Sequence, residues 1–188
     1  MDKEYWKNIY DDNKIISDSS NFCLFIIKYL NENNISIKNV LDCGCGNGRD
    51  TYELSKYYSV DGIDNNGFVP KKKENCNFYN ENFVTYNKDK YDLIYTRFTL
   101  HSINDEEVLY FLKSIKSNKH LVIETRSDKG SLNNLYFGNS HYRNLTNLNN
   151  LIKILINLKF QIIYLEENNN FAIYNNENPI CIRIICKK

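Results

Sequence analysis

The sequence predicts an α/β fold, in which a mostly parallel sheet carries helices on both faces. Two observations predict it. Short apolar runs, each suited to one strand, alternate along the chain with segments whose apolar residues recur at helical spacing. In addition, the apolar run that ends at Leu41 leads into a glycine-rich turn, a helical segment and a second apolar run. A chain of 188 residues is long enough to build one such domain.

Composition and charge narrow the classes of protein. The formal net charge of +1 argues against a surface that binds nucleic acid throughout, although a local basic pocket stays open. No window approaches the roughly eighteen apolar residues that a membrane span needs, and the polar N-terminus does not resemble a signal peptide. We therefore expect a cytoplasmic protein without a membrane partner. The six cysteines lack paired C-x-x-C spacing, which predicts reduced thiols in the core and no bound metal.

Two helices are expected ahead of the glycine-rich turn. Residues 3–10 place Tyr5, Trp6, Ile9 and Tyr10 on one side of a short helix. A second helix follows a cap at Ser19 or Ser20, with an apolar stripe that contains Phe22, Phe25, Ile26 and Tyr29. Residues 1–35 are thus predicted to form a helical cap. Its first helix either packs on the core or closes over a ligand, with Tyr10 at the substrate.

The glycine-rich turn and its two flanking acids predict a nucleoside site. The alternating glycines let the chain turn sharply from a strand into a helix over Arg49–Tyr58. The next strand, 59–63, ends at Asp64, where a carboxylate can accept two hydrogen bonds from a ribose diol. The pattern is not the G-x-G-x-x-G of dinucleotide folds. Asp42, ahead of the first glycine, would repel a pyrophosphate but suits a ligand that carries an ammonium group.

These residues resemble two motifs of class I S-adenosylmethionine-dependent methyltransferases of the small-molecule type. Asp42-Cys43-Gly44-Cys45-Gly46-Asn47-Gly48 is similar to their first motif, and Gly62-Ile63-Asp64 to their second. The resemblance covers about residues 20–188 and implies a single domain over 1–188. Its fold would be a Rossmann-like three-layer sandwich with a seven-stranded sheet, ordered 3-2-1-4-5-7-6, whose seventh strand is antiparallel.

The resemblance also implies an enzyme that binds S-adenosylmethionine and releases S-adenosylhomocysteine. Cofactor contacts are implied for Asp42, Cys43, Gly44, Cys45, Gly46, Arg49, Asp64, Asn65, Asn82, Phe83, Thr96, Arg97 and Phe98. Asn82 follows the third predicted strand, 76–79, and stands where the family often has an aspartate. The last three residues follow the fourth predicted strand, 91–95, in the place of the family's fourth motif.

The second half of the chain continues the alternation of helices and strands. Asn104 or Asp105 caps a helix with buried Val108, Phe111, Leu112 and Ile115, and a fifth strand follows at 120–124. Residues 128–144 form a long loop rich in aromatic residues, which we interpret as a lid over the acceptor site. Thr146 is expected to cap the last helix. The final strands are predicted at 160–165 and 179–186.

Arginines and histidines near the strand ends indicate the acceptor. Arg97, Arg126 and Arg143 are expected on the crevice side, and arginine favours carboxylate or phosphate. An acidic small molecule, such as a sugar or nucleotide sugar, is therefore the predicted acceptor. Substrate contacts are assigned to Tyr10, Arg97, Arg126, Tyr142 and Arg143. His101 and His141 are the candidate bases, needed only if the methylated atom is a hydroxyl oxygen.

Three alternatives stay open from the sequence. An RNA or mRNA-cap methyltransferase is favoured by Lys71-Lys72-Lys73 and the arginines but disfavoured by the near-neutral charge. A non-catalytic module could bind S-adenosylmethionine as a partner subunit. An NAD-linked oxidoreductase is the residual possibility. The sequence leaves open oxygen against nitrogen as the methylated atom, and also the oligomeric state.

Overall fold

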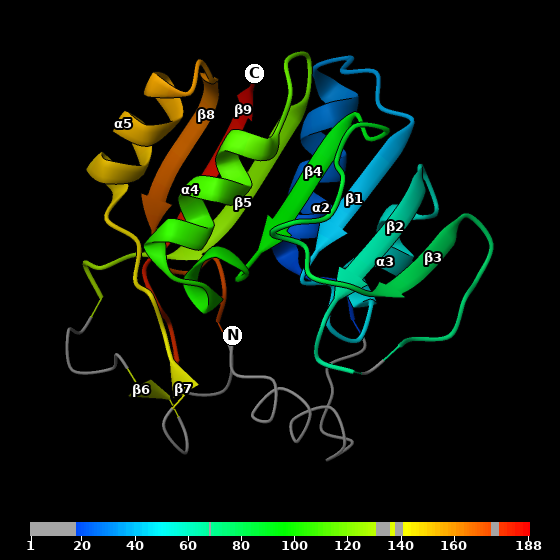
Figure 1. Cartoon of the computed structure of the whole chain (residues 1–188), viewed down its shortest axis with the longest axis horizontal. Coiled ribbons are helices and arrows are strands. Elements are labelled where there is room, and N and C mark those ends of the chain that lie inside the picture. The colour runs from blue at the N-terminus through cyan, green and yellow to red at the C-terminus, as the bar shows by residue number, and fades with distance from the viewer. Residues whose placement is uncertain (1–17, 68, 131–135, 138–140, 174–176) are drawn as a thin grey trace.

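The protein is built on a seven-stranded sheet of order β3-β2-β1-β4-β5-β9-β8 (Figure 1). The computed structural model describes residues 18–67, 69–130, 136–137, 141–173 and 177–188. The strands of this sheet are β1 Asn39–Cys43, β2 Ser59–Asp64, β3 Cys76–Asn80, β4 Leu93–Arg97, β5 His120–Arg126, β8 Gln161–Asn168 and β9 Cys181–Lys187. Only β9 runs antiparallel to its neighbours β5 and β8. The predicted order 3-2-1-4-5-7-6 is therefore confirmed.

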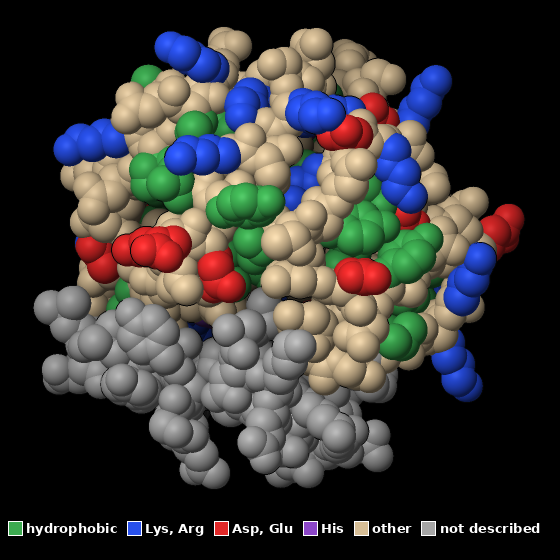
Figure 2. All heavy atoms as spheres, in the orientation of Figure 1, with side chains coloured by type: hydrophobic (Ala, Val, Ile, Leu, Met, Phe, Trp, Pro, Cys, Tyr) green, Lys and Arg blue, Asp and Glu red, His purple; other side chains and the backbone are tan. Residues whose placement is uncertain are grey.

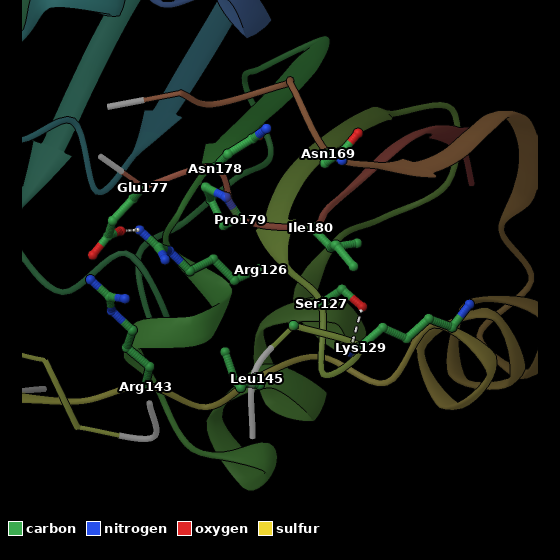
Figure 3. Close-up of a pocket in the computed structure, with 11 residues that line it drawn as sticks. Arg126, Ser127, Lys129, Arg143, Leu145, Asn169, Glu177, Asn178, Pro179 and Ile180 are labelled. Carbon is green, nitrogen blue, oxygen red and sulfur yellow. Dashed lines mark hydrogen bonds and ion pairs between the residues drawn. The ribbon is translucent and has the colours of Figure 1, made fainter. Parts of the chain in front are cut away.

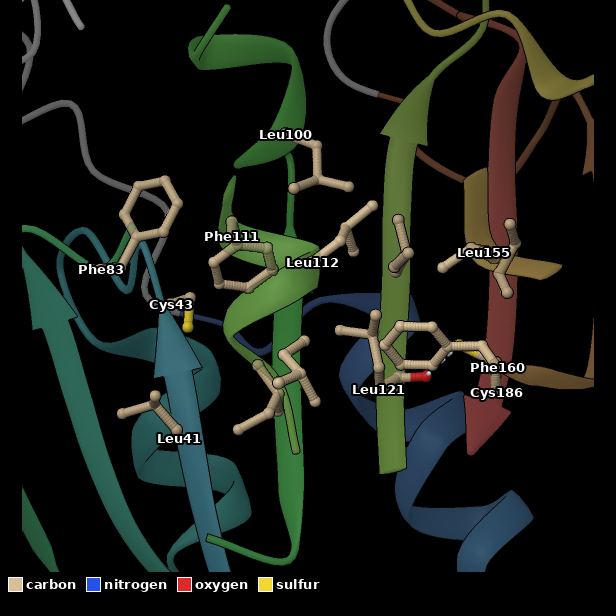
Figure 4. Close-up of a cluster of buried hydrophobic side chains, with 14 of the residues drawn as sticks. Leu41, Cys43, Phe83, Leu100, Phe111, Leu112, Leu121, Leu155, Phe160 and Cys186 are labelled. Carbon is tan, nitrogen blue, oxygen red and sulfur yellow. Dashed lines mark hydrogen bonds between the residues drawn. The ribbon is translucent and has the colours of Figure 1, made fainter. Parts of the chain in front are cut away.

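Helices cover both faces of the sheet, as predicted (Figure 1). On one face, α2 Asn21–Glu32 and α3 Arg49–Leu54 pack in a cluster that includes Val40 of β1. On the other, α4 Asp105–Ser114 and α5 Leu148–Asn157 pack in a cluster that includes Leu41 (Figure 4). Neighbouring residues of β1 thus face opposite clusters, because successive side chains of a strand point to opposite sides. Both faces are buried, as expected for parallel strands.

Side-chain caps explain where three helices begin. Ser20 accepts a hydrogen bond from the backbone of Cys23 at the start of α2, and Asn104 with Glu107 forms a capping box at α4. The cap of α5 is Asn147, so the prediction of Thr146 was wrong. The Thr146 hydroxyl instead lies 3.1 Å from that of Thr125. The backbone N–H of Thr146 donates to the carbonyl of Arg126, and the side chain of Asn147 accepts the N–H of Asn150 at the start of α5.

Several predicted elements have different bounds in the structure, including the strands predicted at 120–124, 160–165 and 179–186, which are β5, β8 and β9. The helix predicted over 49–58 ends at Leu54, whose carbonyl accepts hydrogen bonds from the N–H groups of Tyr57 and Tyr58 in a closing turn. The fourth strand was predicted at 91–95 but is β4, which starts two residues later and runs to Arg97. Tyr91 stays outside it, with its hydroxyl donating to the carboxylate of Asp61 over 2.7 Å.

The predicted lid contains regular structure. Within 128–144, β6 Tyr136–Phe137 pairs with β7 His141–Tyr142 in an antiparallel two-stranded sheet, so this segment is not a plain loop. Residues 131–135 and 138–140 lie outside the described residues, as does the first helix of the predicted N-terminal cap with Tyr10. The lid role therefore stays a prediction.

The cysteines and the helices bear on two further expectations. All six cysteines are free thiols, and five of them are buried, while Cys45 is half-buried. In the part of the chain that the structure describes, no helix is long and apolar enough to cross a membrane.

Candidate active site

The carboxyl ends of β1, β2, β4 and β5 meet at one edge of the sheet, where an open α/β sheet binds its ligands. The strand register places Cys43 beside both Ile63 and Thr96, and Arg97 beside Glu124. The end of β1, which carries the first motif, thus lies between the ends of β2 and β4. Most residues predicted to contact the cofactor gather here.

The turn between β1 and α3 depends on its glycines for two reasons. Gly44, Gly46 and Gly48 all have a positive φ, of 71°, 55° and 78°, which side chains rarely adopt. The turn is also tightly packed from outside. A Cβ atom at Gly44 would lie 2.9 Å from the side chain of Thr99, and one at Gly48 would lie 2.6 Å from Phe78. The lack of a side chain at Gly44 and Gly48 therefore leaves space for the side chains of Thr99 and Phe78.

Asp64 connects the two motifs. Its Oδ2 accepts the backbone N–H of Gly46 and its Oδ1 accepts that of Asn66, each over 3.0 Å. Burial raises the pKa of Asp64, and the backbone hydrogen bonds oppose that rise. Two carboxylate oxygens offer about four lone-pair sites, so room remains for the hydroxyls of a ribose. The prediction of Asp64 as the ribose ligand fits this geometry.

The residue after Asp64 offers an acceptor for a ligand donor. The side-chain oxygen of Asn65 is buried and has no hydrogen-bond partner among the described residues. A buried polar atom without a partner costs free energy. A ligand N–H at this position would remove that cost. The site therefore fits a nucleoside that binds beside Asp64 and Asn65.

Asp42 lies beneath the glycine turn and is 3% exposed. Its Oδ2 accepts a hydrogen bond of 2.6 Å from the hydroxyl of Thr51 in α3. Burial raises the pKa of Asp42 to about 7, although the Thr51 hydrogen bond opposes the rise. An ammonium group nearby would favour the ionised form. The charge of Asp42 therefore changes near neutral pH, and its role as the ligand of an ammonium group stays a prediction.

A buried network that the sequence analysis missed supports the turn. Asp50 accepts hydrogen bonds from the backbone N–H and the hydroxyl of Ser20, each 2.7 Å, and from the hydroxyl of Tyr95, 2.8 Å. These residues belong to α3, to the cap of α2 and to β4. The acid in the first turn of α3 was visible in the sequence, but its partners are 30 and 45 residues away. No local pattern indicates such a pairing.

Arg97 is already engaged by the protein. Its Nε lies 2.9 Å from Oε1 of Glu124, while Nε of Arg183 lies 2.7 Å from Oε2 of the same carboxylate. The side chain of Glu124 is fully buried, and that of Arg97 is 17% exposed. Arg97 was predicted to contact both cofactor and acceptor. Because the fully buried Glu124 holds its guanidinium, Arg97 is poorly suited to bind an anion of the acceptor.

Phe98 has an unusual backbone conformation at the end of β4. Its φ is 56°, which is rare for a bulky residue and is often found at functional sites. Its backbone N–H donates to the carbonyl of Glu124 over 2.8 Å. The ring centroid lies 4.4 Å from Cζ of Arg97 and 5.6 Å from Cζ of Arg126. Phe98 therefore links the strand ends near the cofactor residues to the side of the sheet that carries Arg126.

His101 also lies against Phe98, with 5.3 Å between ring centroids. It belongs to the short helix η1 Leu100–Ser102 and is buried. Its carbonyl accepts the backbone N–H of Asn144, so the end of the predicted lid segment is joined to this helix. The other candidate base, His141, lies in β7 with Tyr142. The side chains of His141 and Tyr142 are outside the part of the chain that the structure describes.

The remaining predicted cofactor residues differ in accessibility. Phe83 is fully buried and its ring packs on Phe111, so that only its backbone could reach a ligand. Asn82 is exposed, and its side chain accepts the N–H of Val84. The hydroxyl of Thr96 donates to the carbonyl of Val122 in β5. Arg49 donates from Nη1 to the carbonyl of Asp18 over 3.4 Å.

Cys43 and Cys45, also predicted to contact the cofactor, flank Gly44. Cys43 is buried in the core and Cys45 is half-buried. Burial raises the pKa of both thiols. Both cysteines are therefore protonated near neutral pH, and neither is a thiolate nucleophile.

A pocket of about 520 Å³ opens beside Arg126 at the end of β5 (Figure 3). Its polar lining includes Arg126, Lys129, Arg143, Glu177 and Asn178. A pocket of this size falls in the range that holds small molecules. Two of the three predicted arginines, Arg126 and Arg143, thus share one cavity. The contributions of Lys129 and Glu177 were not predicted.

A family comparison identifies the chain. The model of a family described as a methyltransferase domain matches residues 17–158. The chain belongs to this methyltransferase domain family. The predictions of a methyltransferase enzyme, of the class I family and of S-adenosylmethionine as methyl donor are thereby confirmed at the level of the family. A search among curated proteins found no significant match.

Solved structures show the same fold for this methyltransferase. A 1,6-didemethyltoxoflavin N1-methyltransferase from Burkholderia thailandensis, with bound 1,6-didemethyltoxoflavin and S-adenosylhomocysteine, matches with a TM-score of 0.75 and 16% identity, over 99% of this chain and 86% of that one. A SAM-dependent methyltransferase from Methanosarcina mazei matches with a TM-score of 0.67 and 18% identity, over 85% and 96%. Magnesium protoporphyrin IX methyltransferase from Synechocystis, with bound SAM, gives 0.62 and 14%, over 87% and 77%.

Proposed function

We propose that this methyltransferase transfers a methyl group from S-adenosylmethionine to an oxygen or nitrogen atom of a small, anionic acceptor, such as a sugar or nucleotide sugar. The observation that carries the proposal is the position of the pocket with Arg126 and Arg143. It opens at the strand edge that also carries Asp42 and Asp64. The ring of Phe98, directly after β4, lies 5.6 Å from Cζ of Arg126.

The residues of this chain have separate tasks in the proposed reaction. Asp64 would bind the ribose and Asp42 the ammonium of the amino-acid part. The cofactor would supply a methyl group on a positively charged sulfur. The protein then has mainly to hold the acceptor in line and to exclude water. Aromatic rings beside a positive charge contribute about 0.5–2 kcal/mol of stabilisation. Phe98 offers such a ring directly after the end of β4.

A base is needed only for some acceptors. A carboxylate or a free amine can attack without losing a proton first, whereas a hydroxyl must lose its proton in the reaction. His101 is the candidate for that step, since it lies against Phe98 at the end of β4. If His101→Ala keeps turnover within a few-fold of the unmodified protein across pH, His101 is not the base.

The near-neutral net charge supports a small acceptor over RNA bound along the surface. Figure 2 shows the face covered by α4 and α5, where lysine, arginine, aspartate and glutamate side chains are interspersed with neutral surface. In the lysine run predicted to favour RNA, Lys73 lies over the ring of Tyr52, 3.9 Å from its centroid. A protein that binds RNA along its surface would present a continuous basic stripe.

A turnover screen tests the proposal directly. The protein is incubated with methyl-labelled S-adenosylmethionine and, separately, with sugar nucleotides, acidic metabolites or capped RNA. We expect label in an acidic small molecule, together with release of S-adenosylhomocysteine. Label in capped RNA, with binding that weakens steeply as salt rises, would support the RNA alternative instead. Binding of the cofactor without turnover in any panel would indicate a binding module, and tight binding of NADH alone would indicate an oxidoreductase.

A further inference from the structure

Two carboxylates hold two of the cations that line the pocket beside β5. Glu167 on β8 accepts from the hydroxyl of Ser127 over 2.6 Å and pairs with Lys129. Glu177 pairs with Arg126, with 2.7 Å between Oε2 and Nη2 (Figure 3). Each carboxylate neutralises one cation in the structure as it stands.

The two carboxylates differ in how firmly they are held. Glu167 belongs to a strand, where it lies opposite Ile182 of β9, and its side chain is 8% exposed. Glu177 lies in the connection between β8 and β9, and its side chain is 34% exposed. The Arg126–Glu177 pair is only partly buried, so water competes for its more exposed carboxylate. Glu177 can therefore leave its partner more readily than Glu167, which bonds to both Ser127 and Lys129.

The partner of Glu177 is suited to a ligand oxyanion. The Arg126 side chain is 17% exposed and lines the pocket with Arg143. A guanidinium offers several N–H groups in a fixed fork, which matches the two oxygens of a carboxylate or phosphate. The recorded contact with Glu177 uses the Nη2 end. In Figure 3, Glu177 lies at Arg126 on the side of the pocket that Arg143 also reaches.

We propose that Glu177 is an exchangeable carboxylate, which occupies Arg126 until an oxyanion of the acceptor takes its place. The ligand class is a carboxylate or phosphate group, bound by Arg126 with Arg143 lining the same cavity. The identification of this ligand as the methyl acceptor rests on the proposed function, whereas the anion-binding site does not depend on it. Glu177 thus keeps the arginine neutralised in the unliganded protein and competes with weakly bound anions.

Replacing the carboxylate by an amide tests this exchange. In Glu177→Gln the side chain keeps its size but loses its charge, so an added anion no longer competes with it. We expect inorganic phosphate or malonate to bind the full-length Glu177→Gln variant about tenfold more tightly than it binds the unmodified protein, as measured by calorimetry. The matched control is Glu166→Gln, in a carboxylate of β8 that bonds to Tyr164 and Asn168 instead of a pocket residue. It should leave anion binding unchanged.

Changes at the arginine complete the test. Arg126→Met should abolish the gain in the Glu177→Gln background, and Arg126→Lys, which keeps the charge without the fork, should retain part of it. Equal unfolding midpoints for all variants show that the fold is intact. A gain with phosphate alone indicates a phosphorylated ligand, and a gain with malonate alone indicates a carboxylate. Both outcomes support the exchange.

Two results would overturn the inference. One is an unchanged affinity of Glu177→Gln for both anions, and the other is a gain that persists in Arg126→Met. The failure of the proposed function is recognised separately, by the turnover screen with methyl-labelled S-adenosylmethionine. If label enters an acidic small molecule while Glu177→Gln has no effect on anion binding, only the exchange is wrong. If no acidic small molecule is labelled but the anion affinity rises, the anion site stands and the proposed function fails.

Discussion

The carboxylate of Asp64 accepts a hydrogen bond from the backbone N–H of Gly46, with 3.0 Å between Oδ2 and N. This contact joins the end of β2 to the middle of the glycine turn, 18 residues earlier. The acid predicted to hold the ribose therefore also shapes the turn against which the nucleoside would lie. Loss of the side chain affects both.

Asp64→Ala should weaken binding of S-adenosylhomocysteine by about ten- to a hundredfold, because hydrogen bonds to a charged acceptor contribute about 1.5–3 kcal/mol each. Calorimetric titration measures the change. Asp89→Ala is the matched control, since Asp89 is an exposed carboxylate paired only with Lys116 among the recorded ion pairs, and it should bind like the unmodified protein. An Asp64→Ala affinity within twofold of the unmodified protein would show that the ribose lies elsewhere.

The buried carboxyl of Asp42 predicts a pH dependence of cofactor binding. With a pKa of about 7, Asp42 is mostly protonated at lower pH and mostly ionised above it. Only the ionised form attracts an ammonium group. The apparent affinity for S-adenosylhomocysteine should therefore rise about tenfold between about pH 6 and about pH 8. In Asp42→Asn this rise should be absent, and a rise of the same size in that variant would contradict the assignment.

The same shift has a consequence for stability, with the opposite sign. The pKa of Asp42 is about 7 in the folded chain against a usual 3.8. Between these values the folded protein binds more protons than the unfolded one, so this carboxyl lowers stability as pH rises from about 4 to about 7. Urea unfolding of the unliganded protein should show that loss. Asp42→Asn should show a smaller decline over the same range.

Gly48→Ala should destabilise the protein by about 2–5 kcal/mol. A positive φ costs a side-chain residue about 1–2 kcal/mol, and overpacking adds about 1–3. Here φ is 78° and the new Cβ would lie 2.6 Å from Phe78. Gly67→Ala separates the two effects, because φ is 88° there but nothing lies within 4 Å of the added atom. Urea unfolding should give a clearly smaller loss for Gly67→Ala, and equal losses would exclude a steric role for Phe78.

Glu124→Gln should cost about 3–5 kcal/mol in the free energy of unfolding, because it removes the buried charge that neutralises two arginines. Arg97 and Arg183 each bond to one oxygen of this carboxylate. The control is Glu32→Gln, in an exposed pair with Lys28, which should change stability by less than about 0.5 kcal/mol. A loss below about 1 kcal/mol for Glu124→Gln would mean that water can reach both guanidinium groups.

The sequence by itself determined the architecture and which residues lie at the strand ends and the glycine turn after β1. Two features of the sequence are local. Strand-like apolar runs alternate with segments of helical apolar spacing, and Asp42, the three glycines and Asp64 follow one another at fixed spacing. Local features fix strands, helices and turns, and the rules for connecting parallel strands then bring the strand ends together. The sheet order followed once the family resemblance was added.

Only the tertiary structure decided which charged and polar groups meet. Asp50 with Tyr95, Glu124 with Arg183, and Arg126 with Glu177 are separated by 45, 59 and 51 residues. Such pairs have no spacing that a sequence can reveal, because the sheet brings distant strands side by side. The same holds for Phe78 against Gly48. The sequence predicted that arginines would line the crevice, but packing decided that Arg97 would be held by Glu124 and Arg126 by a more exposed carboxylate.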